Sequence, residues 1–269
     1  MPFVERGLAR IWWSSSSEAD GREAVVLLMG LGCSSDMWFR VAPELARKYS
    51  VIVIDNRGVG RTKVRGAVVV HRIDAMADDV AAVLDDAGES AAHIVGFSMG
   101  GMVAQQFALS HPQRVRSLAL LGTHGGAVHS VKADEAVIRL VFDRATSSPE
   151  QSLRALRPHV YARRTREERI DEDARMRLEY YPTSHGYKAQ LYGILAWSGL
   201  PRLARVRAPT LVIHGVEDAL VPAANGRMLA ERIPGAQLEE LDDASHWLMT
   251  DRTDKTLSLL RSHLSRHAT

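Results

Sequence analysis

The stretch from Ile94 to Gly101 constrains the fold of this chain more than any other. It reads as a buried strand that breaks sharply into a helix, with Ser98 at the corner and Gly96 and Gly100 on either side. Side chains at the two flanking positions of such a tight turn would collide with neighbouring backbone, which explains the glycines. This G-x-S-x-G pattern, called a nucleophile elbow, leaves the serine hydroxyl exposed beside the positive end of the following helix.

Strand and helix patterns alternate around the elbow. An opening hairpin is predicted over residues 3–14. Strand patterns are found at 24–29, 51–54, 93–95, 117–121, 210–213 and 237–241. Several of them are continuous apolar runs, which are typical of strands covered on both faces. Helices are predicted at 41–48, 74–87, 99–110 and 246–263. This alternation predicts βαβ units, and hence an α/β fold with a mainly parallel sheet.

The alternation stops between residues 125 and 203. This part of the chain is helix-like, charged and in places aromatic, with no convincing buried strand. We interpret it as an inserted helical cap, or lid, over the carboxyl edge of the sheet, where open α/β sheets place their sites. Residues 1–124 and 204–269 would then form the core domain.

The elbow serine needs partners, because a hydroxyl is a poor nucleophile until a base takes its proton. Asp218 follows the strand at 210–213 and His246 follows the strand at 237–241, so both are expected at the same edge of the sheet as Ser98. Structural alternatives are a turn residue for Asp218, a loop histidine for His246 and plain strand-to-helix packing for the serine turn. His214 is expected to pack under the Asp218 turn.

Two backbone N–H groups are candidates for holding the oxyanion that forms when the serine attacks. They belong to Met99, directly after the serine, and to Leu31 in the loop after the first buried strand. Gly30 and Gly32 on either side of Leu31 let this backbone turn toward a substrate.

Five features together resemble the α/β-hydrolase superfamily: the glycine-rich first loop, Asp55-x-Arg57-Gly58-x-Gly60, the elbow, His-Gly-x-x-Asp218 and the late His246. The chain looks most similar to small bacterial carboxylesterases, 3-oxoadipate enol-lactonases and cofactor-free haloperoxidase-like perhydrolases. The resemblance implies a serine, acid, histidine order along the chain and a structural role for Arg57. Met29 is a departure, since many relatives carry histidine there.

The resemblance implies hydrolysis of a small-molecule carboxylic ester or lactone through an acyl-enzyme, with no cofactor. Perhydrolysis would use the same groups, and a ligand-sensing protein that retains the triad is a further alternative. Trp38, Tyr192 and Trp197, together with Leu31, are candidates for the pocket lining, although each fits core packing or the cap surface equally well.

Composition narrows the remaining functions. A formal net charge of +2 with interspersed acids and bases does not favour nucleic-acid binding. The histidines are scattered without metal-ligand spacing, so no metal site is expected. A single cysteine, Cys33, the lack of a signal-peptide core in residues 1–6 and the lack of a long apolar run favour a cytoplasmic protein with no membrane contact. The oligomeric state is not indicated by the sequence.

Overall fold

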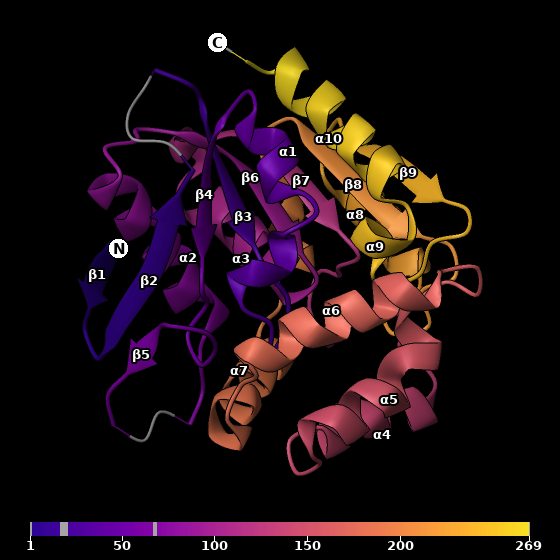
Figure 1. Ribbon diagram of the computed structural model, residues 1–269. Helices are drawn as coiled ribbons and strands as arrows, with labels where there is room; N and C mark the ends of the chain where they lie inside the picture. Colours follow the sequence, from indigo (N-terminus) through magenta and orange to yellow (C-terminus); the bar gives the residue numbers. More distant parts are fainter. Residues whose placement is uncertain (1, 17–20, 67–68, 269) are drawn as a thin grey trace.

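The computed structural model describes residues 2–16, 21–66 and 69–268, so residues 1, 17–20, 67–68 and 269 of the predicted core domain lie outside the described residues. Within the described ranges one sheet has the strand order β1-β2-β4-β3-β6-β7-β8-β9, and β5 pairs with β2 (Figure 1). The strands from β4 to β9 in this order are parallel, and β1, β2 and β5 pair antiparallel. The strand bounds are β1 Phe3–Arg6, β2 Ala9–Ser15, β3 Ala24–Leu28, β4 Ser50–Ile54, β5 Lys63–Val64, β6 Ala92–Phe97, β7 Val115–Leu121, β8 Thr210–Gly215 and β9 Gln237–Leu241.

Strand β3 shows why the apolar runs become central strands. Val25 and Leu27 pack into the core on one face of the sheet, and Val26 and Leu28 pack into the core on the other. Alternate side chains of a strand point to opposite faces, and helices cover both faces here, so every position is apolar. The covering helices are α1 (Ala42–Ala46) and α10 (Thr253–Arg266) on the first face, and α2 (Ile73–Asp86) and α3 (Met99–Ser110) on the second.

Residues 125–203, called the cap segment below, run between β7 and β8 and carry several helices: α4 Glu135–Asp143, α5 Pro149–Val160, α6 Glu167–Glu179, α7 Ser184–Ala196 and a 3-10 helix, Leu200–Arg205. In Figure 1 helices α4 to α7 gather beyond one end of the sheet. Ser148 begins α5 with a capping box, and the Thr183 hydroxyl accepts from the N–H of Gly186 at the start of α7. None of the helices in the described ranges has the length and apolar character needed to cross a membrane.

The loop after β4 braces the loop after β3. Buried Asp55 accepts hydrogen bonds from the N–H and the hydroxyl of Ser35, both at 2.7 Å. Asn56 Nδ2 donates to the carbonyl oxygen of Met29 at 2.9 Å. Arg57 pairs through two hydrogen bonds, at 2.6 and 2.7 Å, with Asp79 of α2. Arg57 therefore has a structural role, as the chain's resemblance to the superfamily implies.

The carboxyl-terminal part differs from the prediction in two elements. The helix expected at 246–263 begins at Leu248 and is divided into α9 (Leu248–Asp251) and α10, because Arg252 leaves the helical conformation with φ −131° and ψ 54°. His246 therefore lies in the loop before α9. Helix α8 (Ala224–Arg232) was not predicted, since the side chains it buries do not form an apolar stripe.

Candidate active site

The elbow holds Ser98 in an unusual backbone conformation. Its φ is 53° and its ψ is −119°, a region that residues with side chains rarely adopt. A Cβ atom on Gly96 would lie 2.4 Å from the carbonyl oxygen of Gly100, and one on Gly100 would lie 2.1 Å from that of Leu28. The structure therefore requires glycine at both flanking positions, and the serine is fixed between β6 and α3.

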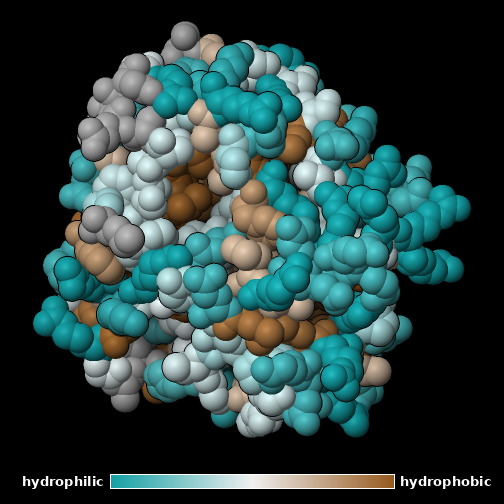
Figure 2. All heavy atoms as spheres, viewed as in Figure 1, coloured by the Kyte–Doolittle hydropathy of each residue, from teal (hydrophilic) through white to brown (hydrophobic). Residues whose placement is uncertain are grey.

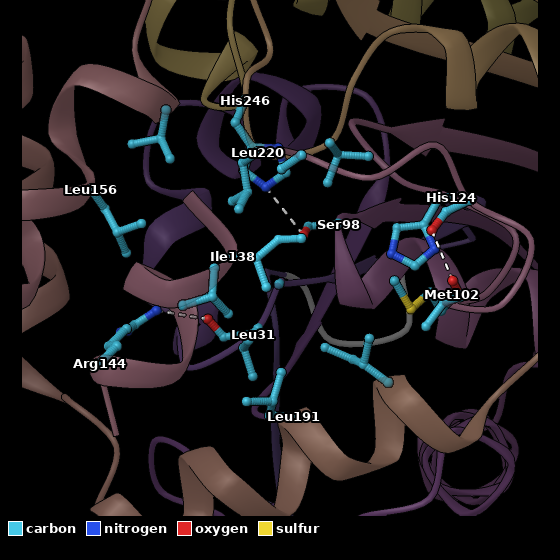
Figure 3. Close-up of a pocket in the computed structure, with 18 of the residues that line it drawn as sticks. Leu31, Ser98, Met102, His124, Ile138, Arg144, Leu156, Leu191, Leu220 and His246 are labelled. Carbon is cyan, nitrogen blue, oxygen red and sulfur yellow. Dashed lines mark hydrogen bonds between the residues drawn. The ribbon is translucent and has the colours of Figure 1, made fainter. Parts of the chain in front are cut away.

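Ser98, His246 and Asp218 meet in one chain of hydrogen bonds. His246 Nε2 lies 3.2 Å from Ser98 Oγ, the contact drawn in Figure 3, and His246 Nδ1 lies 2.8 Å from Asp218 Oδ2. An ionised carboxylate can only accept, so Nδ1 carries the ring proton and Nε2 faces the serine as an acceptor. In this arrangement the serine proton can pass to the imidazole.

The environment of Asp218 keeps its carboxyl ionised. Burial by itself would raise the pKa of Asp218, but the charges and hydrogen bonds of His246 and His214 outweigh it and lower the pKa to about 2. Asp218 Oδ1 also accepts from the backbone N–H groups of Leu220 and Val221, at 3.0 and 2.7 Å. His214 lies beside the Asp218 turn and donates from Nε2 to the Val221 carbonyl at 2.7 Å. Both oxygens of the carboxylate are thus fixed toward named donors.

The loop after β3 lies directly against the elbow. A Cβ atom on Gly30 would be 3.0 Å from the Cβ of Ser98, so a larger residue there would push the loop and the serine apart by a few tenths of an ångström. Gly32 has a φ of 64°, in the left-handed region. The N–H groups of Leu31 and Met99 donate no hydrogen bond to any other group in the described part of the chain. Two unpaired donors therefore flank the serine, as an oxyanion site requires.

Two side chains of the cap segment hold this loop in place. Gln190 of α7 accepts from the N–H of Gly32 at 2.8 Å. Arg144, which follows α4, donates to the carbonyl oxygens of Leu31 and Gly32 at 3.3 and 3.0 Å. Its bond to Leu31 is drawn in Figure 3. The position of the candidate oxyanion donor Leu31 thus depends on the cap segment as well as on the sheet.

A cavity of about 310 Å³ opens at Ser98 and His246. Its wall is mostly apolar, and Figure 3 shows several of the side chains concerned: Leu31, Met102, Ile138, Leu156, Leu191 and Leu220. On the face shown in Figure 2, apolar residues gather between α6 and the α4–α5 pair, helices that supply part of this lining. A pocket of this character fits a small apolar molecule with a few polar groups.

His124 is a polar group in the wall that sequence reasoning did not assign. Its Nδ1 accepts from the N–H of Gly126 at 3.1 Å, so the neutral ring carries its proton on Nε2. Burial, followed by the charge of Lys132, lowers the pKa of His124 to about 4. The ring is therefore neutral at physiological pH. Its place directly after β7, at the same sheet edge as Ser98, was the signal that could have identified it.

Of the four residues predicted to line the pocket, Leu31 lines the cavity, and the other three lie elsewhere. Trp38 is fully buried in the core on the α1 and α10 side of the sheet. Tyr192 is 43% exposed, on the outer side of α7. Trp197 packs into the opposite core and donates from Nε1 to Gln106 at 3.0 Å. Neighbouring positions on the cap helices point in different directions, so residue type alone did not reveal which ones face the cavity.

Comparison with known proteins agrees with this architecture. The family model for the alpha/beta hydrolase fold matches residues 23–253, and the chain belongs to that family. A putative carbamate hydrolase, RutD, of Azorhizobium caulinodans is 33% identical over 252 residues, which cover 91% of each chain. These comparisons, with the fold, define the chain as an α/β hydrolase.

Two solved structures are similar over nearly their whole length. An N-acyl homoserine lactone degrading enzyme, Est816, is 32% identical with a TM-score of 0.83, and the match covers 97% of this chain and 99% of the other. The enol-lactonase from Burkholderia xenovorans LB400 is 25% identical with a TM-score of 0.87, and the match covers 98% and 100%. The relatives named here are hydrolases, and two of them act on lactones.

Proposed function

We propose that this chain is a serine hydrolase that cleaves a carboxylic ester or lactone through an acyl-enzyme. The observation that carries the proposal is the hydrogen-bonded chain from Ser98 through His246 to Asp218, with the serine at the wall of an apolar cavity. A hydroxyl, a neutral imidazole and an ionised carboxylate in this order are the groups that acyl transfer needs.

In the proposed mechanism, His246 takes the proton of Ser98 as the serine oxygen attacks the carbonyl carbon. The N–H groups of Leu31 and Met99 bind the oxyanion, each such donor contributing roughly 3 kcal/mol to transition-state stabilisation. The protonated imidazole, stabilised by Asp218, then gives its proton to the departing alcohol oxygen. Water deprotonated by His246 attacks the acyl-enzyme and releases the acid.

We further propose that residues 125–203 act as a cap domain on a core formed by the rest of the chain. We expect the whole protein to be a cytoplasmic enzyme. The contacts of Arg144 and Gln190 with the loop of Leu31 support this role, as do the cap side chains in the cavity wall. The cap would select the substrate, while the core would carry the chemistry.

The test is hydrolysis of p-nitrophenyl esters from acetyl to long acyl chains, and of γ-lactones with acyl side chains, by the native chain and by Ser98→Ala. We expect turnover that falls by about 10⁴-fold or more in the variant. The preferred chain length would report the depth of the cavity.

Turnover that survives in Ser98→Ala would contradict the assignment of the nucleophile. A folded native chain that hydrolyses no ester or lactone would contradict the proposed reaction. Peroxide-dependent activity or slow, stable ligand adducts would then identify the perhydrolase or sensing alternatives.

A further inference from the structure

Arg177 of α6 is a buried cation in the wall of the cavity that also contains Ser98 and His246. Only 8% of the residue is exposed. Its Nε is buried without a hydrogen-bond partner, and its guanidinium donates to none of the described residues. Its Cζ lies 5.2 Å from the centroid of the Trp247 ring. A guanidinium in this state lacks the acceptors that normally accompany burial.

The acid one helical turn before Arg177 already has hydrogen-bond partners. Asp173 lies one turn before Arg177 on α6 and is fully buried. It accepts from Arg40 at 3.1 Å, from the hydroxyl of Tyr161 at 3.1 Å and from that of Thr250 at 2.6 Å. Within the described residues, no carboxylate oxygen lies within 4 Å of the Arg177 guanidinium. Its charge is therefore not neutralised by an ion pair.

A second buried arginine strengthens the positive character of this cavity. Arg144 is only 6% exposed, lines the cavity and has carbonyl and phenol oxygens, but no carboxylate, as partners among the described residues. An unpaired charge in an apolar wall is costly to the fold, so its presence in a pocket indicates a ligand that completes the pair.

We propose that the substrate carries a carboxylate in addition to its ester or lactone carbonyl, and that Arg177 binds this carboxylate. The planar guanidinium can offer two parallel N–H donors to one carboxylate, and exclusion of water strengthens the pair. Arg144 adds positive potential but is already committed to the loop of Leu31. Arg177 is thus a specificity-determining residue of the cap segment, an inference that rests on the proposed hydrolase function.

The experiment compares matched esters that differ only in charge. Monomethyl esters of linear dicarboxylic acids place the carboxylate on the acyl side, and acetyl esters of linear hydroxy acids place it on the alcohol side. Each is paired with the analogue in which a primary amide replaces the carboxylate. We expect kcat/KM of the native enzyme to favour the carboxylate by about tenfold or more in one of the two series, which identifies the side that Arg177 contacts.

Variants assign this preference to one residue. Arg177→Met should lower the carboxylate-to-amide ratio by about tenfold, and Arg177→Lys should keep part of it. Arg175→Met is the matched control, because it removes the same charge from an exposed position of the same helix and should keep the native ratio. Equal rates on both members of every pair, or equal ratios in Arg177→Met and Arg175→Met, would overturn the proposal.

Two further measurements separate this inference from the proposed reaction. Calorimetric titration of Ser98→Ala with the paired esters measures binding without turnover. If Ser98→Ala binds the carboxylate ester more tightly than the amide, and this difference disappears when Arg177→Met is added, the anion site is supported even if the native chain hydrolyses neither ester. Equal binding of both members overturns it. The thermal midpoint of Arg177→Met should be unchanged or raised, since an unpaired buried charge is removed, whereas a clear fall would mark Arg177 as a packing residue and count against the proposal.

Discussion

The side-chain amide of Gln190 joins Gly32 to Arg57, two residues in separate loops at the edge of the sheet. Its Oε1 accepts from the N–H of Gly32 at 2.8 Å, and its Nε2 donates to the carbonyl oxygen of Arg57 at 2.7 Å. Gln190 itself is fully buried in α7. The cap segment is therefore bonded to the backbone that presents the Leu31 N–H, and this suggests a coupling between cap packing and catalysis.

Gln190→Leu should weaken both stability and activity. The change keeps the size of the side chain but leaves the buried N–H of Gly32 without its partner, at a cost of about 1–3 kcal/mol, and removes the donor to the partly buried carbonyl of Arg57. We expect a lower free energy of unfolding in urea and a kcat that falls by about tenfold, because the loop that carries the proposed oxyanion donor, the Leu31 N–H, loses its support.

Tyr192→Ala is the control for this variant, since Tyr192 lies on the exposed side of the same helix and outside the cavity. It should keep kcat/KM within about threefold. A Gln190→Leu enzyme with native kcat would contradict the coupling.

The low pKa of Asp218 predicts a pH dependence of stability. Its folded-state value of about 2 lies below the ordinary value of 3.8. Ionisation of this carboxyl therefore stabilises the fold above about pH 4, and that contribution is lost as the pH falls toward about 2. We expect the difference in free energy of unfolding between the native chain and Asp218→Asn to shrink by roughly 2 kcal/mol over this interval.

Urea unfolding of both proteins at several pH values from about 6 down to about 2 measures this difference. A difference that stays constant, or grows, on acidification would show that Asp218 does not titrate as described.

Gly100→Ala should prevent stable folding. The added methyl group would lie 2.1 Å from the carbonyl oxygen of Leu28, a backbone atom that cannot move without disturbing β3. We expect a loss of at least about 3 kcal/mol, seen as a large fall in the thermal midpoint or as insoluble protein. Gly88→Ala is the comparison. A Cβ atom added there would meet nothing within 4 Å, although φ is +73°, so this change should cost only about 1 kcal/mol. Equal melting temperatures for the two variants would refute the close packing of the elbow.

Trp38→Phe tests whether Trp38 serves the core and not the cavity. The residue is fully buried away from the cavity wall, so the smaller ring should leave a void and cost about 1–3 kcal/mol of stability. We expect a lower thermal midpoint with kcat/KM and chain-length preference close to native. An altered chain-length preference would indicate that Trp38 helps to line the cavity.

The central sheet was predictable because burial on both faces of β3 requires an apolar residue at every position, as in Val25 and Val26. The juxtaposition of Ser98, Asp218 and His246 followed from similar reasoning. Each comes after a parallel strand, and the carboxyl ends of parallel strands meet at one edge of a sheet. Helix α8 was missed because Asn225 and Gly226 are among the few residues that it buries.

The cavity wall was much less predictable. Leu191 lines the cavity while the next residue, Tyr192, faces outward, and this depends on how α7 packs over the sheet. Arg144 and Arg177 resemble the surface arginines around them in sequence. Only the packed structure reveals that both are buried and lack carboxylate partners, because charge pairing between distant segments has no local periodicity.

The assignment of Ser98 as the nucleophile is tested by trapping it. The native chain is incubated with a p-nitrophenyl phosphonate, which leaves a stable tetrahedral adduct on an activated serine, and the modified peptide is identified by mass spectrometry. We expect one adduct per chain, on Ser98, with loss of ester hydrolysis in proportion to labelling and a strongly reduced labelling rate in His246→Ala. An adduct on another residue, or full hydrolytic activity after Ser98 is labelled, would contradict the proposed mechanism.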